Sequence, residues 1–175
     1  SQPVRVVLDT RLRIPMESRL VQTAREVPVI VFCYAPDKDK KAALEAAGVT
    51  VLEAKLLPKE ELDELFMQLG EFQLSKEELN GRHISLRNCL EQLGQRGLDS
   101  VLIEGGATIH AAALQENCCD LVQVYVAPKL FGGDGLSPIG GMGITAPDKA
   151  VLLSEPTITR LGQDLLLEYT RKEQF

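Results

Sequence analysis

Histidine and paired cysteine, the usual metal-binding and redox residues, are scarce in this sequence of 175 residues. The histidines are His83 and His110 alone, too few for a histidine-built metal site. The four cysteines include no C-x-x-C pair, and the adjacent Cys118 and Cys119 are poorly placed to share a metal or a disulfide. We therefore expect no metal, and reduced, partly buried thiols in a cytoplasmic protein.

An excess of basic charge and a long apolar run are also missing. The net charge of −6 argues against the basic face that nucleic-acid binding needs. No apolar run approaches the ~20 residues of a membrane span, and the start at Ser1, leading at once into a strand with Arg5, shows no signal peptide. An acidic chain can still bind a phosphorylated metabolite, because a few backbone N–H groups suffice for that.

Apolar strands alternate with amphipathic helices as far as Val126. The expected strands are 4–8, 29–34, 49–52, 101–103 and 121–126, and the expected helices are 37–47, 59–69, 85–95 and 108–115. This alternation in a chain of this length predicts one three-layer α/β domain with a mostly parallel sheet. The last apolar runs, 151–153, 157–159 and 165–167, have no helices between them and are expected to be antiparallel, with a tight turn at 162–164. Residues 70–82 follow no clear period and are interpreted as an extended connection or insertion.

The strongest local signal is a strand, a glycine turn and a helix within residues 101–113. The apolar run ends at Glu104, Gly105 and Gly106 follow, and Thr108 opens an alanine-rich helix. The free N–H groups and positive dipole end of such a helix favour a phosphate, at the sheet edge where α/β proteins bind ligands. The alternative is a tight turn that binds nothing.

Two side chains near this turn could take part in chemistry. Glu104 could hydrogen-bond a substrate hydroxyl or amine, or transfer a proton near the reacting carbon. Its alternative role is to receive N–H groups of the helix start. His110, one turn into the helix, could face a phosphate, or it could be a surface or packing residue.

A second candidate region follows the first strand, at residues 9–11. Thr10 could bond a phosphate or a ribose, and Arg11 or Arg13 could pair with a 2′-phosphate. A polar turn with solvated arginines is the alternative. The glycine-rich loop at 127–134 could be a lid or a dimer edge, or only a shaped turn.

Three stretches together resemble one family. They are 2–10 (QPVRVVLDT), 104–107 (EGGA) and 126–133 (VAPKLFGG), and in this order they look like the reductase half of the bifunctional bacterial riboflavin-biosynthesis deaminase–reductases. The resemblance runs from Gln2 to about Glu168. It implies a dihydrofolate-reductase-like fold, a homodimer and NADPH as the cofactor. It also implies reduction of the ribosyl group of a phosphorylated pyrimidine, 5-amino-6-(5-phosphoribosylamino)uracil, to the ribitylamino product.

The resemblance also implies roles for particular residues. Glu104 is the candidate catalytic residue, in contact with the substrate. The candidate cofactor-binding residues are Thr10, Gly105, Gly106, Ala107, Thr108, Ile109, His110, Ala111 and Ala112.

The sequence departs from the family's pattern at its start. The family's first central strand, its serine–aspartate–glycine segment and the preceding zinc deaminase domain are not found. We therefore expect an N-terminally truncated domain without deaminase activity, inactive by itself, with a disturbed sheet edge, a dimer or a swapped arrangement. Two other functions stay open: a related reductase with another pterin or pyrimidine substrate, and a non-catalytic nucleotide-binding or dimerisation module.

Overall fold

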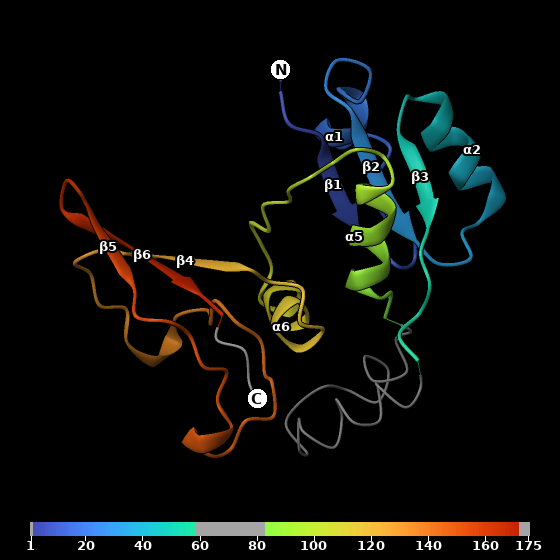
Figure 1. The fold of residues 1–175 in the computed structure, drawn as a ribbon. Coiled ribbons are helices and arrows are strands. Elements are labelled where there is room, and N and C mark those ends of the chain that lie inside the picture. The colour runs from blue at the N-terminus through green and yellow to red at the C-terminus, as the bar shows by residue number, and fades with distance from the viewer. Residues whose placement is uncertain (1, 59–82, 172–175) are drawn as a thin grey trace. The chain divides into compact units, whose positions relative to one another are not determined.

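The computed structural model describes residues 2–58 and 83–171, which fall into two compact units (Figure 1). Unit 1 comprises residues 2–58 and 83–101, and unit 2 comprises residues 102–171. The helix expected at 59–69 and the insertion at 70–82 lie outside the described residues. The expectation of a single domain therefore stays a prediction.

A parallel three-stranded sheet forms the centre of unit 1. Its strands are β1 (Arg5–Leu8), β2 (Val29–Cys33) and β3 (Thr50–Glu53), in that order. Strand β2 is buried along its whole length, because it lies between the other two strands and has cores on both faces. The three strands and their parallel direction confirm the sequence prediction.

Helices cover both faces of this sheet, as Figure 1 shows. Helices α1 (Arg19–Gln22) and α2 (Lys38–Ala46) belong to one face, and α5 (Leu86–Gly94) belongs to the other. Side chains alternate along β2, so its residues divide between two cores. One core contains Val29, Val31 and Cys33 with Val21 and Leu44, and the other contains Ile30 and Phe32 with Cys89 and Leu93. The three-layer arrangement is therefore confirmed for unit 1, whereas the short α1 was not expected from the sequence.

Unit 2 consists of one α-helix and an antiparallel sheet. Helix α6 (Ala107–Gln115) precedes β4 (Leu121–Val126), and β5 (Thr157–Leu161) and β6 (Asp164–Thr170) form a hairpin. Two short 3-10 turns, η1 (Gly132–Asp134) and η2 (Pro147–Lys149), interrupt the long connection between β4 and β5. The strand order is β4-β6-β5, and all pairs are antiparallel. This was expected of β5 and β6 but not of β4, which the alternation with helices had assigned to the parallel series. The turn between β5 and β6 is at Gly162, where φ is 64°. Arg171 Nη1 donates to the Leu114 carbonyl at the end of α6 at 2.8 Å, which ties the helix to the sheet.

The strand expected at 101–103 is wrong. These residues form no strand, and Val101 and Leu102 are 42% and 73% exposed. A strand exists only where a neighbour accepts and donates its backbone hydrogen bonds, and none of the described strands pairs with this stretch. The run at 151–153 likewise contributes only one isolated bridge, between Leu153 and Arg171.

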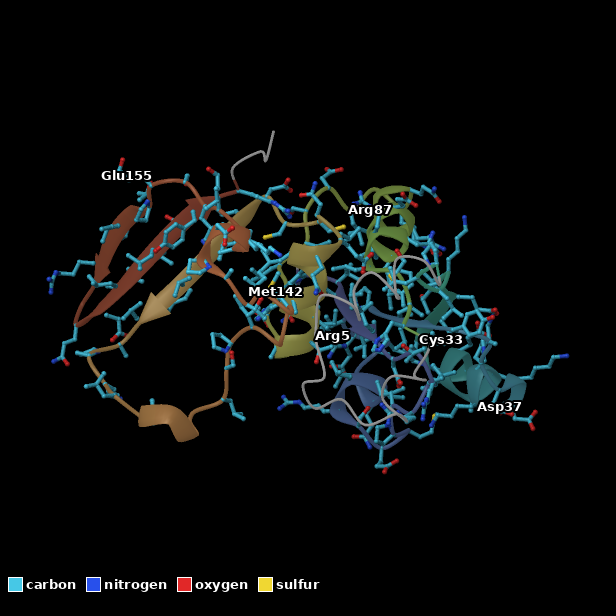
Figure 2. All side chains as sticks on the ribbon, turned by 90° about the horizontal axis from the view of Figure 1, so that it is seen from below. Arg5, Cys33, Asp37, Arg87, Met142 and Glu155 are labelled. Atoms are coloured by element: carbon cyan, nitrogen blue, oxygen red, sulfur yellow. The ribbon has the colours of Figure 1, made fainter. Side chains whose placement is uncertain are left out.

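All four cysteines are free thiols, and two of them, Cys33 and Cys89, are buried. Cys33 lies in β2, within unit 1 in Figure 2, and its Sγ is 3.6 Å from the Leu52 carbonyl oxygen. Burial, and after it the negative charge of Glu53, raises the pKa of the Cys33 thiol from 9.0 to about 11.

This raised pKa predicts a loss of stability in alkali. The ordinary value of 9.0 applies to the unfolded chain, so between pH 9.0 and about 11 the unfolded thiol ionises while the folded thiol keeps its proton. The contribution of Cys33 to the free energy of unfolding is therefore complete below pH 9.0 and is lost as the pH rises to about 11. We expect Cys33→Ala to show a smaller fall over this range in urea unfolding. Equal falls in the two proteins would contradict this account, since all other titrating groups are shared.

Candidate cofactor-binding site

Helix α6 begins without a side-chain cap. Its N-cap is Gly106, with φ 88°, and glycine has no side chain to accept a hydrogen bond from the helix start. The N–H groups of Ile109 and His110 return to the Gly106 carbonyl at 3.0 and 3.1 Å. Among the described residues, no acceptor takes the N–H groups of Ala107 and Thr108. Two donors and the positive end of the helix dipole are therefore open to an anion.

The backbone of the glycine turn is sterically open. A Cβ built on Gly105 or on Gly106 meets no atom within 4 Å, and both residues are exposed. A phosphate has room to approach the main chain closely here, as two consecutive glycines predict.

Glu104 is exposed and lies directly before this turn. Within the described part of the chain, its carboxylate accepts no hydrogen bond from the start of α6. The structure therefore does not support the alternative that Glu104 only caps the helix, and the carboxylate stays available to a ligand.

The long loop after η1 packs against α6. The Gly140 N–H donates to the Ala107 carbonyl at 2.9 Å. His110 Nδ1 lies 2.8 Å from the Pro138 carbonyl oxygen, and its Nε2 lies 3.3 Å from the Ile103 carbonyl oxygen. Met142, labelled in Figure 2, belongs to the same loop and is half-buried. These contacts lie beyond the glycine-rich stretch 127–134, whose role as a lid, a dimer edge or a shaped turn stays a prediction.

The second candidate region lies in unit 1, at the carboxyl end of β1. The Asp9 carboxylate accepts from the Ile14 N–H at 2.7 Å and lies 4.0 Å from Arg13 Nε. The Thr10 carbonyl accepts from the Tyr34 N–H at 2.9 Å, which places Thr10 at the edge where β1 and β2 both end. Asp9 and Tyr34 therefore hold this turn in shape.

The candidate residues thus form two groups. Glu104 and the residues 105–112 share one turn and one helix in unit 2, whereas Thr10 belongs to unit 1. Sequence reasoning missed the contacts of Pro138 and Gly140 with α6. No sequence pattern identified in the chain pointed to them, because a contact between residues so far apart leaves no local signal.

Other kinds of site receive no support from the described residues. No group of three or more histidine, cysteine or acidic side chains among them could hold a metal ion. None of the described helices has the length and apolar character to cross a membrane.

The fold and this turn define the class of protein: an α/β domain in which a glycine turn opens a helix start to an anion. A family model described as the RibD C-terminal domain matches residues 1–167. The chain belongs to the RibD C-terminal domain family.

Curated relatives and solved structures agree with this family. The chain is 34% identical over 169 residues to the riboflavin biosynthesis protein RibD of Actinobacillus pleuropneumoniae, covering 96% of the chain and 39% of the relative. It is 29% identical over 171 residues to the 2,5-diamino-6-ribosylamino-4(3H)-pyrimidinone 5′-phosphate reductase of Methanothermobacter thermautotrophicus, covering 97% of the chain and 67% of the relative. The chain thus spans 39% of the RibD relative's length.

The structural similarity confirms the expected fold. The structure of Acinetobacter baumannii RibD matches with a TM-score of 0.71 and 25% identity, over 98% of the chain and 38% of that protein. The Saccharomyces riboflavin biosynthesis reductase Rib7 matches with a TM-score of 0.65 over 97% of the chain and 65% of that protein, at 14% identity. The fold is that of the RibD reductase domains, similar to dihydrofolate reductase as expected.

The open turn predicts a sharp effect of one methyl group. Gly105→Ala should leave the fold intact, because the added Cβ meets no atom, but it should occupy space that a phosphate needs. We expect affinity for NADPH, the cofactor that the resemblance implies, to fall about tenfold, measured by calorimetry. Gly94→Ala is the matched control, because a Cβ on Gly94 also meets no atom within 4 Å. Equal affinities in the two variants would show that the turn does not contact the cofactor.

Proposed function

We propose that this chain is the NADPH-dependent reductase domain of riboflavin biosynthesis. Its reaction reduces the ribosyl group of 5-amino-6-(5-phosphoribosylamino)uracil to the ribitylamino product. The observation that carries this proposal is the exposed Glu104 directly before the open turn at Gly105 and Gly106, in a chain of the RibD C-terminal domain family. The name of the Methanothermobacter relative, a reductase of a ribosylaminopyrimidinone 5′-phosphate, supports the substrate class.

The residues of the glycine turn fit a nicotinamide dinucleotide. The open N–H groups of Ala107 and Thr108 suit the pyrophosphate, and residues 105–112 form the proposed cofactor-binding segment. In unit 1, Thr10 is proposed to bond the cofactor, and Arg11 or Arg13 to pair with its 2′-phosphate. The comparison of NADPH with NADH in calorimetry tests the arginine role. When bound, NADPH supplies the hydride.

Glu104 is proposed to orient the substrate. Ring opening of the ribosylamine to an imine makes C1′ electrophilic, and a carboxylate beside the cofactor turn can accept a hydrogen bond from a ribosyl hydroxyl. Such a bond holds the reacting carbon in one position, where orientation lowers the barrier. The same carboxylate could transfer a proton as the product forms.

Glu104→Gln separates these roles from cofactor binding. We expect kcat/KM to fall about a hundredfold, since the amide neither accepts a proton nor carries the charge, while NADPH affinity stays unchanged. Glu155→Gln is the control, because Glu155 is an exposed carboxylate in a different part of unit 2, labelled in Figure 2.

The assay uses this chain and a version extended to the length of its curated relatives. Loss of NADPH affinity in Glu104→Gln would mean that the carboxylate supports the turn and not the substrate. If neither version of the protein binds NADPH, the reductase proposal fails, and a non-catalytic dimerisation or assembly module replaces it.

A homodimer is proposed as the working assembly, on an exposed apolar sheet face. On one face of the β4-β6-β5 sheet, Val124 lies opposite Leu167, which lies opposite Ile158. Val124 and Ile158 are 40% and 62% exposed. A contiguous apolar face of this kind is typical of an interaction surface.

A charge on this face should separate the subunits. We expect Ile158→Glu to yield monomers in analytical ultracentrifugation, because dimerisation would bury the carboxylate without a partner. Thr159→Glu places the same charge on the opposite face of β5 and should leave the dimer intact. If both variants sediment as dimers, the dimer interface lies elsewhere on the protein.

A further inference from the structure

Both ring nitrogens of His110 lie within hydrogen-bond distance of backbone carbonyl oxygens of unit 2. Nδ1 lies 2.8 Å from the Pro138 oxygen and Nε2 lies 3.3 Å from the Ile103 oxygen. Carbonyl oxygens only accept hydrogen bonds. A protonated imidazole donates to both, and a neutral one donates to one of them. In either form, the ring nitrogens face the chain itself.

The contact with Ile103 matters because the preceding stretch is otherwise unsupported. Residues 101–103 form no strand, and Glu104 and Gly105 are exposed. Within the described residues, the Ile103 carbonyl is the one group between Val101 and Gly105 that makes a hydrogen bond. His110 therefore holds the backbone immediately before the proposed site.

A second hydrogen bond holds the loop close to the contact between His110 and Pro138. The Gly140 N–H donates to the Ala107 carbonyl at 2.9 Å, at the first residue of α6. A Cβ on Gly140 would lie 3.2 Å from that carbonyl oxygen and 3.4 Å from its carbon, tighter than side chains usually pack. The loop at 138–140 is thus held against the start of α6 by His110 on one side and by a glycine-dependent backbone bond on the other.

We propose that, within the proposed cofactor-binding segment 105–112, His110 is a positioning residue that holds the turn in place and does not itself contact the cofactor. By bridging Ile103 and Pro138, it holds both the segment that carries Glu104 and the loop at 138–140 against the first turns of α6. The purpose of this role rests on the proposed function, but the contacts that define it lie within the protein itself.

The first test therefore uses no ligand. Hydrogen exchange at the Gly140 amide, followed by NMR, reports whether the loop stays on α6. We expect His110→Phe, which keeps a ring without donors, to lower the protection of this amide by about three- to tenfold. His110→Gln keeps an amide donor and should fall between Phe and the native residue. Unchanged protection in His110→Phe would overturn the proposal.

The second test measures NADPH affinity by calorimetry. We expect His110→Phe and Gly140→Ala each to lower NADPH affinity, and His110→Gln to lower it less than His110→Phe. The double variant His110→Phe/Gly140→Ala should lose no more affinity than the weaker-binding of the two single variants, because both changes act through the same loop. Additive losses, with Gly140 protection intact in His110→Phe, would show that His110 touches the cofactor directly. If the unaltered protein does not bind NADPH but the hydrogen-exchange results are as expected, the proposed function is wrong and the positioning role of His110 is still supported.

Discussion

The uncapped start of helix α6 is the constraint on which the proposed site depends. Helices α1, α2 and α5 have the N-cap residues Ser18, Asp37 and Ser85, whose side chains accept a hydrogen bond from the first turn. The N-cap of α6 is Gly106, which has no side chain to make such a bond. With glycine in place of a serine or aspartate cap, the helix loses only a few tenths of a kcal/mol, and a bound anion can supply the missing acceptor. Among the described α-helices, α6 is thus the one whose start lacks a side-chain cap, and it directly follows the turn after Glu104, the carboxylate that the family resemblance assigns to the substrate.

Openness at this turn has a structural consequence. Gly105 and Gly106 have no side chains to pack, so the turn cannot be held by its own contacts. Its position must come from neighbours, and the structure provides them as hydrogen bonds from His110 and from the loop at Gly140. At the far end of the same helix, Arg171 binds the Leu114 carbonyl. Helix α6 is therefore held at both ends by residues distant in sequence.

Much of this fold could be predicted from sequence because its local signals agree with its packing. The β-branched run at 29–33 is a buried strand, and Gly48, with φ 97°, follows α2 as a helix-stopping glycine should. The stretch at 101–103 has the same apolar character but forms no strand, because the periodicity of a run says nothing about whether a partner strand lies beside it. In the candidate site, the glycine turn could be predicted because its residues are consecutive in the sequence. The contact of His110 with Pro138 joins residues 28 positions apart, and no local pattern encodes it.

One short segment combines two tasks that a hydride transfer needs together. Glu104 stands next to Gly105 and Gly106 in the chain, so the group proposed for the substrate and the groups proposed for the cofactor share one backbone. Because these residues are consecutive, a shift of the segment as a whole moves the Glu104 backbone and the glycine turn together. Thr10 differs in this respect, because Asp9 and Tyr34 hold its turn within unit 1. The groups proposed for the substrate and for the cofactor pyrophosphate therefore lie together within unit 2, where their spacing is fixed by one stretch of backbone.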